Sequence, residues 1–236
     1  MKLLIATLLA LTTTLPRNTS GTVLAKMHAK YAGKWMKSFS FTQATESYRN
    51  DSLIKTATWY ENIVYPNKFR IDFGDKTSGN AAIFTTDSVY SFRDGKLQNT
   101  FSNDDDLTFI LGGMYFHPLD TVKAMFGRMG YNFRKFYEND SVYVIGADSA
   151  NETINQFWID KHKLVVVKFM NYTHGEKEEG IFYNHRQFGN SWSETACDFY
   201  INDKLVQKEK YYDCKANATI NLKIFNPHKF ILLSEP

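Results

Sequence analysis

Residues 58–75 read TWYENIVYPNKFRIDFGD and residues 79–95 read GNAAIFTTDSVYSFRDG, and these two runs decide the fold. From Lys68 to Phe73, charged and apolar residues alternate with the period of two that is typical of a strand with one apolar and one solvent-facing side. Gly74-Asp75 interrupts the pattern, and Asp94-Gly95 is a hairpin dipeptide. The stretch therefore predicts three or four consecutive antiparallel strands. Its many aromatic residues would form either a large core or the wall of an apolar pocket.

Strand patterns separated by turn signals fill most of the chain. A helix is expected over residues 22–35, where Leu24, Met27, Tyr31 and Trp35 form one apolar stripe. Strands are expected over 39–48, 53–65, 131–138, 141–147, 156–160, 164–172, 180–188, 193–201, 204–214 and 219–225. This spacing fits a barrel or sandwich and leaves too few helices for βαβ units. We predict a mainly β protein with a few helices, in which a curved antiparallel sheet forms an incomplete β-barrel covered by helices.

The region 107–129 interrupts the strands with an apolar, methionine-rich run. Asp104 to Asp106 could cap a short helix there, and a second helix is expected from Leu119 to Met129. Gly112-Gly113 would provide a hinge. Methionine side chains adapt to varied shapes, which suits a movable lid. The alternative is that these helices permanently fill the concave side of the sheet.

Composition and motifs exclude several classes of function. The net charge is +3 with basic and acidic residues interleaved, so we expect no nucleic-acid binding. The six histidines have no metal-ligand spacing, and no nucleophile elbow, dinucleotide fingerprint or P-loop occurs. We therefore expect no metal, no cofactor and no enzymatic activity.

The N-terminus predicts export. Lys2 precedes an apolar run from Leu3 to Leu11, which is too short to span a bilayer. Residues 1–20 are interpreted as a signal peptide and residues 21–236 as a single half-barrel domain. In a hairpin turning at Asn202-Asp203, Cys197 would lie opposite about Lys208, far from Cys214, so the two thiols should be free.

A family resemblance covers residues 38–92. SFSFTQ (38–43), then a Trp-bearing strand, then YPNKFRI (65–71) and TDSVYSF (86–92) resemble, in order and spacing, the LolA/LolB-like lipoprotein-sorting proteins. A weaker echo is Phe225-Asn226-Pro227. The resemblance implies a periplasmic carrier that shields acyl chains of a lipoprotein or lipid and passes them toward the outer membrane. In that family the residue before the proline is typically an arginine linked to lid closure, whereas this chain has Tyr65.

These observations give a specific hypothesis. The expected cavity wall consists of Trp59, Phe69, Ile71, Phe84, Tyr90 and Phe92. The expected lid consists of Leu107, Ile110, Leu111, Met114, Phe116, Met125, Phe126 and Met129. The resemblance implies an acylated lipoprotein or lipid as ligand, with an inner-membrane release complex and an outer-membrane receptor as partners, and we expect a monomer. The alternatives are a lipid-sensing envelope protein on the same fold, acting without transport, and a lipocalin-like enzyme.

Overall fold

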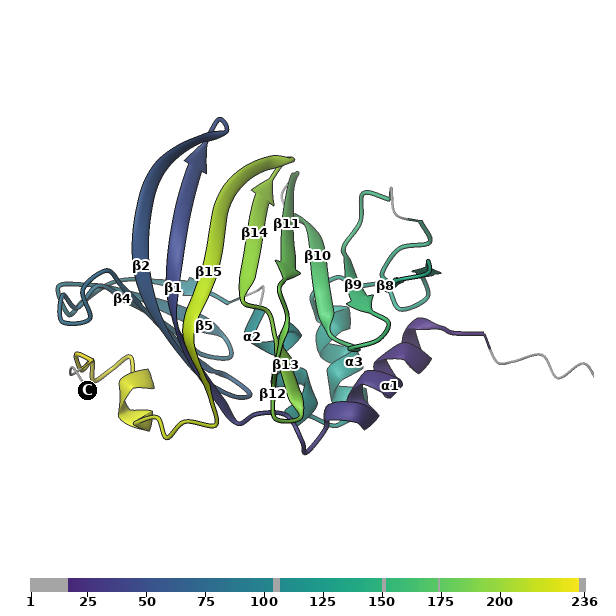
Figure 1. The fold of residues 1–236 in the computed structure, drawn as a ribbon, viewed down its shortest axis with the longest axis horizontal. Coiled ribbons are helices and arrows are strands. Elements are labelled where there is room, and N and C mark those ends of the chain that lie inside the picture. Colours follow the sequence, from purple (N-terminus) through teal and green to yellow (C-terminus); the bar gives the residue numbers. More distant parts are fainter. Residues whose placement is uncertain (1–16, 104–106, 150–151, 174, 234–236) are drawn as a thin grey trace, which may run out of the picture.

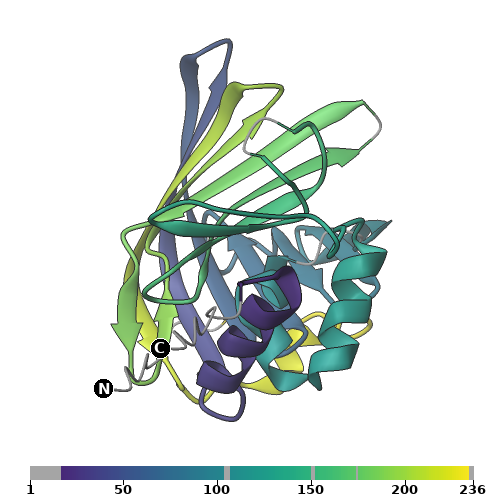
Figure 2. The ribbon, with the colours of Figure 1, turned by 90° about the vertical axis from the view of Figure 1, so that its right-hand side faces the viewer.

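The computed structural model describes residues 17–103, 107–149, 152–173 and 175–233. Within these ranges a thirteen-stranded antiparallel sheet curves around a layer of helices without closing on itself (Figures 1 and 2). The predicted fold class is therefore confirmed. Residues 1–16 of the predicted signal peptide lie outside the described residues. The predicted helix cap at 104–106 also lies outside them.

The order of the strands explains how one chain builds this shape. It is β6-β5-β4-β3-β2-β1-β15-β14-β11-β10-β9-β8-β7. One half contains β1 (Ser38–Arg49), β2 (Ser52–Val64), β3 (Lys68–Phe73), β4 (Ala81–Phe84), β5 (Ser88–Arg93) and β6 (Lys96–Ser102). The other contains β7 (Phe136–Glu138), β8 (Val142–Ile145), β9 (Gln156–Asp160), β10 (Val166–Thr173), β11 (Glu176–Tyr183), β14 (Ala196–Ile201) and β15 (Lys204–Ala216). The chain runs outward from β1 to the edge strand β6, reappears at the opposite edge strand β7, and returns until β15 pairs with β1.

Helical segments carry the chain between the two edges of the sheet. They are α2 (Leu107–Ile110), the 3-10 turn η1 (Gly113–Phe116) and α3 (Leu119–Arg128), and α1 (Ser20–Tyr31) packs beside them on the concave side (Figure 2). The core lies between this layer and the sheet. At its centre the ring of Phe126 stacks on that of Phe157 at 4.6 Å between centroids. Burying such rings supplies much of the stability that holds helices to sheet.

Four predicted elements had wrong bounds for local reasons. The first helix begins at Ser20, because Thr19 caps it, and ends at Tyr31, before Gly33 takes a φ of 72°. The predicted strand 131–138 shortens to β7, since the side chain of Asn132 accepts a hydrogen bond from the backbone of Arg134 and forms a turn. The predicted strands 180–188 and 193–201 are each interrupted, and their inner ends form a small separate hairpin, β12 (Arg186–Phe188) with β13 (Ser191–Ser193).

The end of the chain was also predicted wrongly. Residues 217–233, here called the C-terminal segment, contain the 3-10 turn η2 (Leu222–Phe225) and no strand among the residues described. The segment lies against the outer, convex face of β1 to β5 (Figure 1). Arg70 of β3 is fully buried beneath it and donates hydrogen bonds to the carbonyls of Ile224 and Ile231, at 2.9 Å each. The predicted solvent-facing side of β3 is therefore covered.

Candidate functional site

An apolar cavity of about 360 Å³ lies between the concave face of the sheet and α2. We call it the concave cavity. Its lining comes from strands on both sides of the β1–β15 junction and from the start of the helical layer. The lining residues are Trp59, Glu61, Ile63, Tyr65, Phe69, Ile71, Phe84, Asn103, Leu107, Thr108, Leu111, Phe182, Phe199, Val206, Gln207, Glu209 and Tyr211.

Strand alternation places the first group of wall residues. In the sheet register Phe69 lies opposite both Ile63 and Phe84, and the rings of Phe69 and Phe84 stack at 4.8 Å between centroids. Ile71 follows two residues later on the same face. Four of the six predicted wall residues, Trp59, Phe69, Ile71 and Phe84, thus line one cavity.

The other two predicted wall residues lie on the opposite face. Tyr90 and Phe92 are cross-strand partners of Ile83 and Ala81, whose side chains point outward. Phe92 stacks on Phe230 of the C-terminal segment at 4.5 Å. These two aromatics belong to a second core on the convex side, so their assignment to the cavity wall was wrong.

The predicted lid residues separate into three groups. Leu107 and Leu111 border the cavity. Ile110, Met114 and Phe126 are buried in the main core, and Met125 and Met129 pack against it half-buried. Phe116 is 38% exposed and does not line the cavity. Only the edge of the helical layer formed by α2 therefore borders the concave cavity.

Tyr65, which stands where the resembling family has an arginine, joins the strands to the helical layer. Its ring stacks on Phe116 at 5.8 Å between centroids, and burial raises its pKa. A Cβ atom added to Gly112 would lie 2.3 Å from Trp35 Nε1 and 2.9 Å from Tyr65 Cε1. Glycine at this position therefore allows close packing of the layer against Tyr65, and Gly112 does not have the open surroundings of a free hinge.

The polar residues of the cavity, and its wall beyond β1, were not predicted from the sequence. Glu61 on β2 and Glu209 on β15 are 6% and 7% exposed and line the cavity. Phe182 and Phe199 complete the wall on β11 and β14. The alternation of Glu209 and Tyr211 with lysines indicated an inward face on β15, but the pairing of β15 with β1 is a tertiary feature.

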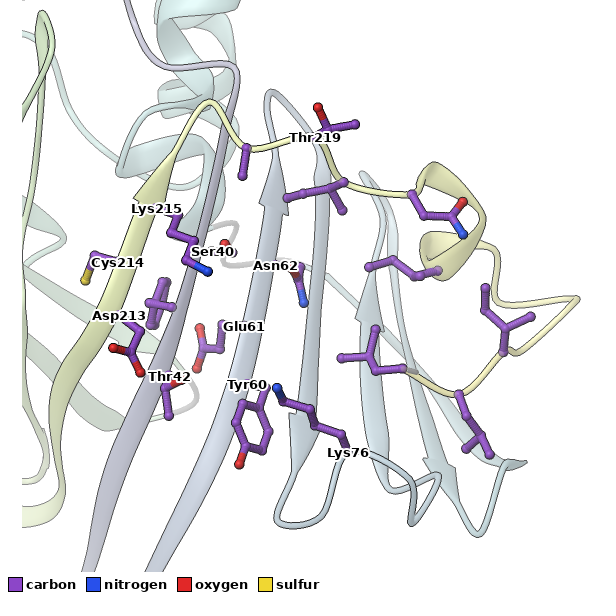
Figure 3. A pocket seen from close by; sticks show the side chains of 18 residues that line it. Ser40, Thr42, Tyr60, Glu61, Asn62, Lys76, Asp213, Cys214, Lys215 and Thr219 are labelled. Atoms are coloured by element: carbon purple, nitrogen blue, oxygen red, sulfur yellow. The ribbon is translucent and has the colours of Figure 1, made fainter. Parts of the chain in front are cut away.

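A second hollow lies on the convex face, between the sheet and the C-terminal segment (Figure 3). Its volume is about 740 Å³. Polar side chains such as Thr42, Asn62 and Lys76 are among those that line it. The concave cavity is the smaller and more apolar of the two, and it alone lies in the main core, so we take it as the candidate site.

No group of three or more His, Cys, Asp or Glu side chains within the described residues is placed to hold a metal ion. None of the helices in the same ranges is long and apolar enough to cross a membrane. Cys197 lies opposite Glu209, one residue from the predicted position because of a bulge between Phe199 and Tyr200, and both cysteines are free.

An unclosed antiparallel half-barrel with helices on its concave side and an apolar cavity beneath them is the LolA-like fold. Solved structures that share it include three at 10–14% identity to this chain. An outer membrane lipoprotein-sorting protein domain from Vibrio parahaemolyticus has a TM-score of 0.62 at 12% identity, over 88% of this chain and 96% of that one. A LolA superfamily protein from Nitrosomonas europaea has 0.57 at 14%, over 89% and 98%.

The third is a DUF1329 family protein from Desulfovibrio piger, with a TM-score of 0.57 at 10% identity over 88% of this chain and 95% of that one. The resemblance read from residues 38–92 is thereby confirmed at the level of the fold. No family model and no curated protein matches the chain. At these identities the likeness establishes the fold alone.

Proposed function

We propose that this protein is a carrier that binds the acyl chains of a lipoprotein or lipid in the concave cavity and transfers them toward the outer membrane. The observation that carries the proposal is the 360 Å³ apolar cavity, which is within the range of ligand sites. Burying eight methylene groups would contribute about 6 kcal/mol before the costs of association. Apolar burial is non-directional, so the ligand can also be released.

The same proposal covers location and partners. The N-terminal segment, residues 1–20, would direct export to the periplasm, and the rest of the chain would act as a monomer without catalysis. Loading and delivery would involve an inner-membrane release complex and an outer-membrane receptor. Leu107 and Leu111 are the lid residues that would move, because Ile110 and Met114 are held in the core.

Two variants test the proposal. Leu111→Asp places a carboxylate at the cavity border, and Leu97→Asp makes the same change at an exposed position of β6. The full-length chain would be produced in a bacterial periplasm and its bound lipids extracted for mass spectrometry. We expect stoichiometric acylated ligand with the wild type and Leu97→Asp, and its loss with Leu111→Asp. An empty wild-type protein that also takes up no fluorescent acyl probe would refute the carrier function.

A further inference from the structure

A polar cluster lies where β1, β2 and β15 meet, and its two carboxylates line the concave cavity. Its carboxylates, Glu61 and Glu209, come from β2 and β15, the two strands that flank β1. Between them on β1, Gln43 and Thr45 face the same side of the sheet, opposite Trp59 and Glu209 in the register. All of the cluster's side chains are at least nine-tenths buried.

The two carboxylates differ in their hydrogen bonds. Glu209 accepts from Tyr211 Oη at 2.8 Å, from Cys197 Sγ at 2.9 Å and from the amide of Gln207. Glu61 accepts from no donor in the described part of the chain. It lines the concave cavity and also borders the convex hollow of Figure 3. The hydrogen-bonding capacity of the Glu61 carboxyl is therefore unused by the described residues and open to a ligand in the cavity.

Gln43 provides a second unpaired acceptor nearby. Its Nε2 donates to Thr45 Oγ1 at 2.9 Å, whereas its buried Oε1 has no hydrogen-bond partner. Gln43 Oε1 therefore has an unused acceptor position, and the carboxyl of Glu61 keeps capacity for a hydrogen bond with a ligand in the cavity. No lysine or arginine is among the described residues that line the cavity, so nothing there would neutralise an anionic ligand.

We propose that the concave cavity selects an amphiphile with a primary amine head, which donates hydrogen bonds to Glu61 while its acyl or alkyl chain lies against the aromatic wall. This inference rests on the proposed carrier function and adds the class of head group. The amine could belong to a free long-chain amine or to an aminophospholipid. An ammonium paired with a carboxylate makes a short, charge-assisted hydrogen bond, which an alcohol cannot match.

Proton transfer makes this pairing compatible with burial. Burial raises the pKa of Glu61 well above its ordinary value, and the carboxylates of Glu209 and Glu194 raise it further. Burial therefore favours the neutral acid form of Glu61 in the empty cavity. The amine nitrogen takes this proton, breaking the O–H bond and forming an N–H bond, which leaves an ammonium–carboxylate pair. An ammonium arriving from solution releases one proton to the solvent on binding.

Four ligands at pH 7.5, below their micelle concentrations, test the inference. Dodecylamine, dodecanol and dodecanoate share one chain and differ in head group, and lysophosphatidylethanolamine carries the amine on a phospholipid. Titration calorimetry is compared for the wild type, Glu61→Gln and the exposed control Glu176→Gln. We expect the wild type and Glu176→Gln to bind dodecylamine at least about tenfold more tightly than dodecanol. In Glu61→Gln the two affinities should become equal.

The outcomes separate the two proposals. Tight binding of dodecylamine alone would identify a free amine as the ligand class, and binding of both amines would include aminophospholipids. Proton release with dodecylamine, measured from the buffer dependence of the binding enthalpy, supports the pairing. If dodecanol or dodecanoate binds the wild type as tightly as dodecylamine, the head-group inference is overturned while the carrier function stands. If no ligand binds, both are overturned.

Discussion

Replacing Arg70 tests the attachment of the C-terminal segment most directly. The guanidinium makes two hydrogen bonds to Asp72, Nε–Oδ2 at 2.8 Å and Nη2–Oδ1 at 2.6 Å, and two more to carbonyls of the segment. It also lies 4.7 Å from the ring centroid of Phe230. Arg70→Met keeps much of the aliphatic stem but leaves the Asp72 carboxylate buried and unpaired.

The magnitude follows from burial. The side chains of Arg70 and Asp72 are 0% and 2% exposed, and removing one partner of such a pair costs about 3–5 kcal/mol. Burial raises the pKa of Asp72 even though Arg70 lowers it, because desolvation opposes the charged form. A well-packed apolar pair often replaces such a buried ion pair at little cost. The double variant Arg70→Met/Asp72→Leu should therefore regain about 1–3 kcal/mol, while the two carbonyls stay unpaired.

Urea unfolding followed by tryptophan fluorescence measures these differences. Arg93→Met, an exposed arginine on the neighbouring strand β5, is the control and should change stability by less than about 0.5 kcal/mol. Limited proteolysis should cut residues 217–233 faster in Arg70→Met than in the wild type. A loss below about 1 kcal/mol in Arg70→Met, or a double variant no more stable than the single one, would show that the buried pair does not hold the segment.

Three further predictions concern pH, packing and thiols. Burial raises the pKa of Glu194 to about 7, so its contribution to stability should be lost as pH rises from about 4.5 to 7. Glu194→Gln should therefore reduce the fall in the free energy of unfolding across this range by about 3 kcal/mol, as measured by urea unfolding. Gly112→Ala should lower stability by about 1–3 kcal/mol, because the new Cβ would lie 2.3 Å from the indole nitrogen of Trp35. Gly127→Ala in α3 meets nothing within 4 Å and should raise stability by about 0.5–1 kcal/mol. Equal melting temperatures for the two variants would contradict this packing. Burial raises the pKa of the Cys197 thiol well above its usual value. In the native protein Ellman's reagent should therefore modify the half-buried Cys214 at least about tenfold faster than Cys197, and both thiols should react in urea. Equal rates in the native protein would be evidence against the placement of Cys197.

Local sequence patterns determined much of the architecture. Alternation from Lys68 to Phe73 and the Asp94-Gly95 turn produced the first meander, because a period of two and a hairpin dipeptide act over a few residues. The helix at 119–129 was predicted to within one residue, because helical periodicity is also a local property of the sequence. Four cavity residues on β2, β3 and β4 followed from that alternation once the concave face was known.

Only the tertiary structure decided which face of each strand is covered, and by what. Alternation assigns Arg70 and Phe69 to opposite faces, but it does not show that residues 217–233 return to bury Arg70, or that Phe92 faces them. Glu61 and Glu209 are 148 positions apart in the chain, and only the pairing of β1 with both β2 and β15 brings them to one cavity floor. The physical reason is that strand periodicity is a local property, whereas burial depends on long-range pairing and on segments that pack over a face without joining the sheet.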